Sequence, residues 1–218
     1  MNQNGHGMPA NKQEATPAPV NRGFGHQIFS RRTLIGLGAA VIGGLLFRPG
    51  HLYGRFELVV RSFSIALVLV GLALRAWGAA SAGRHTRTDS IEAPELATGG
   101  AYGHVRNPIY LGSMILGLGF VGFLGDPWML LLYGLTFSVL YVAIIPAEEK
   151  FLREKFPEQY LRYSAAVPRL IPRLRPWSGA YQRPLDWRAA SGELRVLLLL
   201  VITAVLLWVG VNTRGFLR

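Results

Sequence analysis

The stretch IYLGSMILGLGFVGFLGDPWMLLLYGLTFSVLYVAIIP, residues 109–146, decides the fold because it holds two apolar runs separated by one tripeptide. The runs cover about 109–125 and 128–146, and each approaches the roughly 20 residues that a helix needs to cross a bilayer core. Only Gly125-Asp126-Pro127 joins them, which allows only a tight antiparallel helical hairpin. The start of the first helix and the end of the second are therefore predicted on the same side of the membrane.

The composition agrees with a membrane protein. Half of the 218 residues are hydrophobic, only 16% are charged, and the mean hydropathy is +0.29, which is too apolar for an ordinary soluble domain. The 23 Lys and Arg exceed the 12 Asp and Glu, but they lie between apolar runs, as in proteins whose cations face anionic headgroups rather than nucleic acid. The chain has no cysteine, so disulfides, thiolate metal sites and cysteine nucleophiles are excluded, and no metal site is predicted.

Three further segments complete a predicted all-α, polytopic transmembrane bundle of about five spans. Apolar stretches cover about 58–79 and 194–211, and Arg61 and Arg75 near the ends of the former can snorkel, so they do not exclude a span. The stretch SRRTLIGLGAAVIGGLLF within 28–57 resembles a twin-arginine export signal. It lacks a clear small-residue cleavage site, which favours a first membrane segment. Residues 1–27 are predicted to be disordered.

Two long polar loops, 80–108 and 147–193, are predicted to emerge together. Both are strongly basic, so the positive-inside rule places them in the cytoplasm, and an inner bacterial membrane is the expected location. Within the second loop, apolar residues recur at helical spacing and Pro157 interrupts the pattern. This pattern predicts two short amphipathic cytoplasmic helices lying against the membrane.

The stretch GGAYGHVRNPIYLG, residues 99–112, begins one span with several chemically useful groups. Asn107 is the predicted N-cap and Pro108 the first helical residue, so the helix start can bind an anion. Arg106 adds a cation, and Tyr102 and Tyr110 add aromatic faces with polar tips. The alternative is a plain helix cap with interfacial aromatic residues and a snorkelling arginine.

Glu148 and Glu149 end the other span of the hairpin, where a buried charge needs compensation. Hairpin geometry puts them at the depth of Asn107 and Pro108, so one pocket can use both ends. S-adenosylmethionine suits such a pocket: its ribose hydroxyls and ammonium donate to carboxylates, its carboxylate seeks amides or arginine, and its sulfonium is attracted to aromatic faces. NADPH would also use the arginine and the glycines.

Two blocks, TGGAYGHVRNPIYLG at 98–112 and EEKFLREKFPEQYLRYSAAVPRLIP at 148–172, resemble the isoprenylcysteine carboxyl methyltransferase and phospholipid methyltransferase superfamily of integral membrane enzymes. The resemblance covers about 58–175. It implies a compact helical membrane domain that S-adenosylmethionine enters from the cytosol and a lipophilic acceptor enters from the bilayer. By position, it implies cofactor contacts from Pro94, Glu95, Leu96, Ala97, Tyr102, Arg106, Asn107, Tyr110, Glu148 and Glu149.

Roles beyond the cofactor are less completely assigned. Arg169 is predicted to orient the anionic head of the acceptor, because of its charge and location. No catalytic residue is assigned; His104 is the nearest titratable side chain, and a lone interfacial histidine is more often structural. The chain departs from the isoprenylcysteine enzymes at Asn107, where they carry histidine, and at Ile144, where they carry arginine. These departures favour the broader phospholipid methyltransferase pattern.

The resulting prediction is an S-adenosylmethionine-dependent methyltransferase acting on a lipid or lipid-linked acceptor. Its partners are expected to be membrane lipids and not nucleic acid. The alternatives are an NADPH-dependent reductase of sterol-type lipids and a membrane protein that keeps the fold without catalysis. The predicted organisation is a tail, a first membrane segment with its loop, a methyltransferase membrane domain, and a linker with a last membrane helix: 1–27, 28–57, 58–175 and 176–218.

Overall fold

The computed structural model describes residues 53–83, 95–181 and 184–216, and these residues form helices and connecting segments without a strand. The elements in chain order are η1 (Gly54–Phe56), α2 (Glu57–Ala82), η3 (Gly100–Gly103), α3 (Pro108–Leu124), α4 (Pro127–Lys155), α5 (Pro157–Ala166), η4 (Trp187–Gly192) and α6 (Glu193–Phe216). The predicted tail and nearly all of the predicted first membrane segment lie outside the described residues.

The described helices confirm an all-α membrane bundle. The segments Gly54–Ala82, Pro127–Lys155 and Trp187–Leu207 are long and apolar enough to cross a bilayer, and the apolar helix α3 is shorter. Helices α2, α3 and α6 begin and end within a few residues of the predicted spans, except that α6 continues to Phe216. The chain is an integral membrane protein. The predicted domain boundaries stay a prediction.

The turn between α3 and α4 confirms the predicted hairpin. Gly125 has φ 69° and ψ 22°, a left-handed conformation that glycine adopts without steric cost. Asp126 then caps α4, because its Oδ1 accepts a 2.8 Å hydrogen bond from the Trp128 amide, and Pro127 is the first helical residue. The start of α3 and the end of α4 consequently lie at the same end of the bundle.

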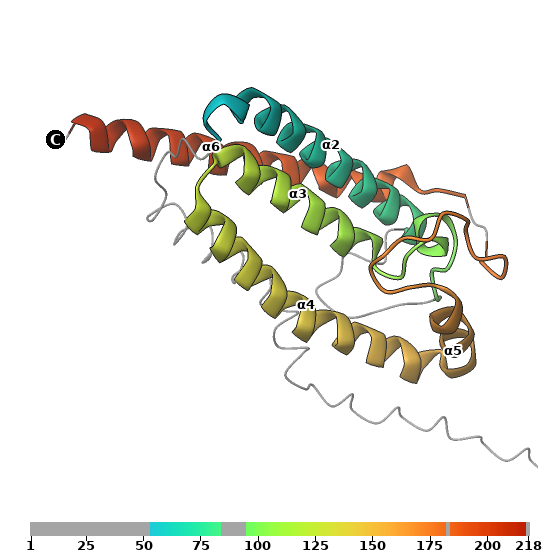
Figure 1. Ribbon diagram of the computed structural model, residues 1–218. Helices are drawn as coiled ribbons and strands as arrows, with labels where there is room; N and C mark the ends of the chain where they lie inside the picture. The colour runs from blue at the N-terminus through green and yellow to red at the C-terminus, as the bar shows by residue number, and fades with distance from the viewer. Residues whose placement is uncertain (1–52, 84–94, 182–183, 217–218) are drawn as a thin grey trace, which may run out of the picture.

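Helices α2 and α3 lie side by side in Figure 1 because glycines let their backbones approach closely. A Cβ placed on Gly71 would lie 2.5 Å from the Leu116 amide nitrogen, and one on Gly119 would lie 2.6 Å from the Ser64 carbonyl oxygen. Such contacts leave no room for a larger side chain. Small residues at helix crossings are the usual means of close packing in membranes.

Helix α4 differs from its prediction, because it continues through Pro146 to Lys155 instead of ending near 146. A proline inside a membrane helix is tolerated where its surroundings satisfy the freed backbone groups. The residues after it, AEEKFLREK, are mostly strong helix formers. The prediction of two short amphipathic helices is therefore wrong for the first of them, and Glu148 and Glu149 belong to the same helix as the membrane span.

The short helix α5 was predicted to lie against the membrane, but its apolar side chains pack against other parts of the protein. Tyr160, Tyr163 and Val167 form a buried cluster against which Leu96 and Trp177 pack. The apolar face of α5 is thus covered by the protein itself rather than by the membrane. This packing places the middle of the second basic loop beside Leu96 of the first.

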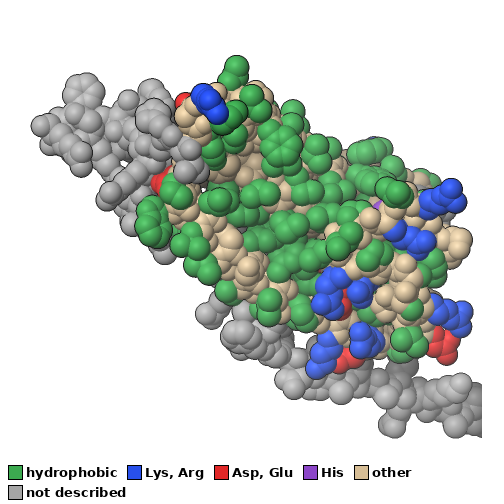
Figure 2. All heavy atoms as spheres, viewed as in Figure 1, with side chains coloured by type: hydrophobic (Ala, Val, Ile, Leu, Met, Phe, Trp, Pro, Cys, Tyr) green, Lys and Arg blue, Asp and Glu red, His purple; other side chains and the backbone are tan. Residues whose placement is uncertain are grey.

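The surface in Figure 2 separates charge from apolar area. Lys and Arg side chains gather near the C-terminal part of α4 and near α5, whereas the face formed by α2, α3 and α4 is largely hydrophobic. Leu58 on α2 and Val142 on α4, with 79% and 76% of their surfaces exposed, are examples of side chains that lipid would cover. The basic end is the end where α3 begins and α4 finishes.

Candidate functional site

Glu149 on α4 lies at the centre of an ion-paired cluster. Arg169 donates to it twice, from Nε to Oε1 at 3.0 Å and from Nη2 to Oε2 at 2.5 Å, and Nη1 of Arg106 lies 3.3 Å from Oε1. Only 4% of Glu149 is exposed, so the two cations compensate a buried charge. The hydrogen bonds to Glu149 also raise the pKa of Arg169. The expectation that the adjacent acids need compensation is met for Glu149.

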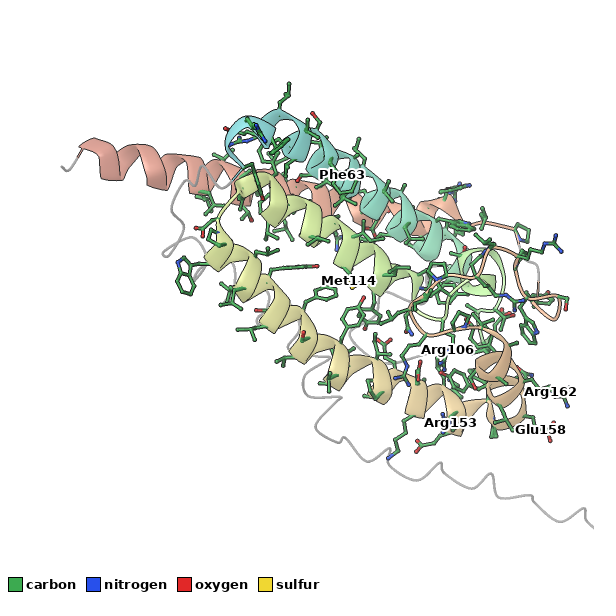
Figure 3. The ribbon with its side chains drawn as sticks, viewed as in Figure 1. Phe63, Arg106, Met114, Arg153, Glu158 and Arg162 are labelled. Carbon is green, nitrogen blue, oxygen red and sulfur yellow. The ribbon has the colours of Figure 1, made fainter. Side chains whose placement is uncertain are left out.

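Arg106 reaches this cluster from the segment before α3 (Figure 3). In the same view, Arg153, Glu158 and Arg162 lie on the outer side of α4 and α5. The pair between Arg162 and Glu158 is long, 3.8 Å, and its side chains are 77% and 88% exposed. Such a pair contributes little, which distinguishes the outer charges from the buried cluster.

Glu148 points to a different neighbour. Successive residues of a helix are about 100° apart around its axis, so adjacent acids cannot share all their contacts. The Tyr110 hydroxyl on α3 donates a 2.5 Å hydrogen bond to Oε1 of Glu148. Burial and, to a smaller extent, the charge of Glu148 raise the pKa of Tyr102, which keeps that phenol neutral. Tyr110 thus connects the start of α3 to Glu148 on α4.

Asn107 joins the two sequence blocks in an unexpected way. It is the N-cap residue of α3 as predicted, but its side chain makes no capping hydrogen bond. Instead Nδ2 donates to the Arg169 carbonyl oxygen at 3.2 Å, and the neighbouring Arg106 amide donates to the Pro168 carbonyl oxygen at 2.9 Å. The Asn-Pro turn and the adjacent acids are therefore neighbours, as the hairpin predicted.

The glycine-rich segment before α3 is held by further bonds. The Arg173 amide donates to the His104 carbonyl oxygen at 3.0 Å, and Nδ1 of His104 donates back to the Arg173 carbonyl oxygen at 2.8 Å. The His104 ring also lies against Trp77, with 5.5 Å between ring centroids. These contacts give His104 a structural role, as expected for a lone interfacial histidine.

The predicted wrapping segment is only partly described. Pro94 lies outside the described residues. Glu95 is exposed, Leu96 packs against the α5 cluster and Ala97 is partly buried. The Tyr163 hydroxyl of α5 donates a 2.9 Å hydrogen bond to the Tyr102 carbonyl oxygen, which fixes η3 against α5. The predicted cofactor residues that are described consequently gather at one end of the bundle.

Comparison with known proteins shows which proteins this chain resembles. Residues 59–159 match the family model described as phospholipid methyltransferase. Protein-S-isoprenylcysteine O-methyltransferase B of Arabidopsis thaliana is 29% identical over 135 residues, 60% of this chain and 67% of that protein. The chain is similar to proteins of the isoprenylcysteine carboxyl methyltransferase and phospholipid methyltransferase superfamily.

Two other relatives match stretches of similar length. Protein-S-isoprenylcysteine O-methyltransferase of Schizosaccharomyces pombe is 30% identical over 62% of this chain and 58% of its own length. The cobalt-zinc-cadmium resistance protein CzcN of Cupriavidus metallidurans is 28% identical over 64% of this chain and 62% of its own length. The matched stretch is therefore about three fifths to two thirds of each relative. No solved structure matches the chain.

The superfamily comparison favours methyl transfer over the predicted alternative of NADPH-dependent lipid reduction. The family match covers Asn107, Glu148 and Glu149 but ends before Arg169 and before α6. Among the described residues, no group of three or more His, Asp or Glu is placed to hold a metal ion.

Arg169 makes contacts that the sequence did not predict. Its guanidinium binds Glu149 through two hydrogen bonds, although 49% of the side chain remains exposed. Orientation of an acceptor by Arg169 stays a prediction. The contacts present make Arg169 a residue that connects the segment after α5 to α4.

A second polar cluster was not predicted. Arg75 of α2 donates to Glu193 of α6, from Nε to Oε2 at 2.6 Å, and also bonds the Ser113 hydroxyl of α3. The two charged side chains are 17% and 10% exposed, so Arg75 does not snorkel to the surface. Ser113 lies about one helical turn below Tyr110. The signal in the sequence was a basic residue, Arg75, inside one apolar segment and an acidic residue, Glu193, directly before another. These two charges do not identify each other as partners.

Proposed function

We propose that this protein transfers a methyl group from S-adenosylmethionine to a lipid or lipid-linked acceptor at the membrane surface. The hydrogen bond between Tyr110 and Glu148 carries the proposal, because it joins the two blocks that resemble the family's cofactor-binding motifs. The ion pairs of Glu149 with Arg106 and Arg169 support the same arrangement.

The chemistry of these side chains suits S-adenosylmethionine. The Glu148 carboxylate would accept hydrogen bonds from the ribose hydroxyls or the ammonium group, and the rings of Tyr102 and Tyr110 would face the sulfonium. Asn107 would contact the cofactor from the start of α3, and the backbone of residues 95–97 would lie along it. S-adenosylmethionine, when bound, supplies an electrophilic methyl group.

Arg106 and Glu149 are proposed to support this site rather than to react. Their mutual ion pair is largely buried, so it fixes the segment before α3 against α4 and keeps Asn107 and Glu148 in register. Methyl transfer is an in-line displacement, so its rate depends on alignment of the acceptor and on exclusion of water. The residues described here provide positioning, and no general base is assigned.

The basic end of the bundle is proposed to face the cytoplasm of a bacterial inner membrane. Lys and Arg gather at this end (Figure 2), and the positive-inside rule places such ends in the cytoplasm. A donor that is soluble in water would enter there, whereas a lipophilic acceptor would come from the bilayer.

Calorimetric titration with S-adenosylhomocysteine tests the cofactor assignment on the full chain in nanodiscs. Glu148→Gln should weaken binding at least tenfold, because a carboxylate is a stronger acceptor than an amide. Glu158→Gln is the matched control, since Glu158 is exposed on α5, and it should bind as the unaltered protein does. Equal affinities for the two variants, or no binding by the unaltered protein, would refute the assignment.

A second measurement separates the reaction classes. Membranes containing the protein should incorporate label from methyl-labelled S-adenosylmethionine into the lipid extract. Acceptor-dependent oxidation of NADPH without methyl incorporation would instead support the reductase alternative.

A further inference from the structure

The segment from Pro168 to Pro176 carries two unusually exposed hydrophobic side chains. Leu174 is 98% exposed and Ile171 is 80% exposed, the two highest values among the large hydrophobic side chains that the structure describes. They match or exceed Leu58 and Val142, which are 79% and 76% exposed on the membrane helices α2 and α4. Ile171 and Leu174, which we call the apolar tip, therefore have the exposure of lipid-facing residues although they lie outside the spans.

The segment bearing the apolar tip is fixed in place. Its backbone pairs with the segment before α3: Pro168 accepts from Arg106 at 2.9 Å, Arg173 donates to His104 at 3.0 Å, and Trp177 donates to Gly103 at 2.9 Å. Prolines 168, 172 and 176 restrict the backbone further. The exposure of the apolar tip therefore comes from a defined conformation.

Neighbouring side chains of this segment contact the rest of the protein, whereas the tip residues do not turn inward. Arg169 binds Glu149, and Nη1 of Arg173 donates to the Ala166 carbonyl oxygen at 2.9 Å. Trp177 packs against Tyr163, with 5.8 Å between ring centroids. Ile171 and Leu174 remain on the outer face.

The depth of the apolar tip follows from its backbone partners. Residues 103–106 directly precede α3, whose apolar run begins at Ile109. Arg106, whose amide donates to Pro168, lies three residues before Ile109, so the paired segment lies close to the end of the apolar span. The headgroup layer is several ångströms thick on each side of the hydrocarbon core. The tip therefore lies at the level of the headgroups.

The charge around the apolar tip complements an anionic membrane. Arg169, Arg173 and Arg175 lie within seven residues, and residues 159–185 contain no Asp or Glu. Arg175 is exposed beside Leu174. Apolar side chains flanked by arginines are typical of segments that insert into the boundary between headgroups and acyl chains.

We propose that Ile171 and Leu174 insert into an anionic leaflet, with Arg175 beside phosphate headgroups. The lipid surface is favoured over a protein partner because the tip lies at headgroup depth and is surrounded by positive charge. The same segment carries Arg169, so lipid contact also restrains the residue that binds Glu149.

The absence of cysteine makes this proposal directly testable. Leu174→Cys and, as a control, Leu161→Cys receive a bimane label in nanodiscs of phosphatidylcholine and phosphatidylglycerol. Leu161 is 67% exposed on α5, whose opposite face is buried. Brominated lipid should quench the label at 174 strongly, and aqueous iodide should quench the label at 161 strongly. Iodide quenching without lipid quenching at 174 overturns the proposal.

The headgroup requirement has its own test. Replacing phosphatidylglycerol with phosphatidylcholine should reduce lipid quenching at 174 at least twofold, and Arg175→Gln should remove most of that difference. Quenching that is independent of headgroup charge would overturn the electrostatic part. Disulfide-linked dimers of Leu174→Cys, without lipid quenching, would assign the tip to a contact between copies and overturn the proposal. None of these readouts depends on methyl transfer.

Discussion

Arg169 and Glu149 form a two-bond ion pair between the segment that follows α5 and the C-terminal part of α4, with distances of 3.0 and 2.5 Å. The carbonyl oxygen of the same arginine accepts from Asn107 at the start of α3. One residue thereby connects three segments that are far apart in the sequence. The stability of the basic end should depend on this connection.

Glu149→Gln should lower the free energy of unfolding by about 2 kcal/mol, because it leaves Arg106 and Arg169 without their carboxylate. Denaturant titration of the purified protein in mixed micelles measures the change. Glu158→Gln removes a carboxylate from an exposed pair and should change stability by less than about 0.5 kcal/mol. Similar losses in both variants would contradict a special role for Glu149.

The pair between Arg75 and Glu193 should contribute to attachment of α6. Removal of either charge alone leaves the other buried without its partner and should cost about 3 kcal/mol. The double variant Arg75→Met, Glu193→Leu should recover most of that loss, because no buried charge remains. A double-mutant cycle on unfolding free energies measures the coupling. Additive losses would show that the two side chains do not stabilise each other.

Gly71→Ala should destabilise the bundle by about 2 kcal/mol, since its new Cβ would lie 2.5 Å from the Leu116 backbone. Gly134→Ala on α4 is the matched control, because a Cβ there meets nothing within 4 Å. That variant should be neutral or more stable by up to about 1 kcal/mol, from helix propensity. Thermal unfolding of both variants in the same detergent measures the two changes. A loss of stability in Gly71→Ala no larger than in Gly134→Ala would argue against the close crossing of α2 and α3.

Tyr110→Phe tests whether the hydroxyl positions Glu148 for the proposed cofactor. A hydrogen bond to a charged group contributes about 1.5 kcal/mol, which corresponds to roughly tenfold weaker binding of S-adenosylhomocysteine. The control is Tyr133→Phe. In the unaltered protein the Tyr133 hydroxyl of α4 donates to the Met114 carbonyl oxygen of α3 at 2.7 Å, and the variant removes this bond. It should affect stability and not affinity. Unchanged affinity in Tyr110→Phe would mean that Glu148 needs no positioning by this bond.

The buried tyrosine Tyr163 predicts a loss of stability in alkali. Burial raises the pKa of Tyr163 above its ordinary value of 10.0, and the nearby Tyr102 raises it further. Above about pH 10 the unfolded chain therefore binds fewer protons than the folded one, so stability falls as the pH rises. Tyr163→Phe should be less stable at neutral pH, from the lost hydrogen bond to Tyr102, but should lose less on alkalisation. Identical alkaline slopes in both proteins would contradict this account.

Sequence patterns predicted the elements better than their contacts. The spans of α2, α3 and α6 followed from apolar runs, and the hairpin followed from Gly125-Asp126-Pro127. The end of α4 was misplaced because Pro146 resembles a helix end, although a membrane helix tolerates it. Adjacent placement of the two motif blocks was predictable from hairpin geometry.

The partners of individual side chains were not predictable. Arg75 and Glu193 are separated by 118 positions, and no local pattern connects them. Asn107 was expected to cap α3, but its side chain makes no capping hydrogen bond, and its Nδ2 donates to a carbonyl oxygen of the segment after α5. Such choices depend on tertiary packing, which brings segments together only after the helices have formed.

Because α4 is one continuous helix, its C-terminal part moves together with its membrane-embedded part. Its 29 residues extend about 43 Å, whereas a bilayer core is about 30 Å thick, so the part that bears Glu148 and Glu149 projects beyond the hydrocarbon. Thicker or thinner bilayers change the tilt of such helices. A change of tilt in the lipid-embedded half would swing both carboxylates relative to Asn107, so that the thickness of the host bilayer becomes a variable in the geometry of the site.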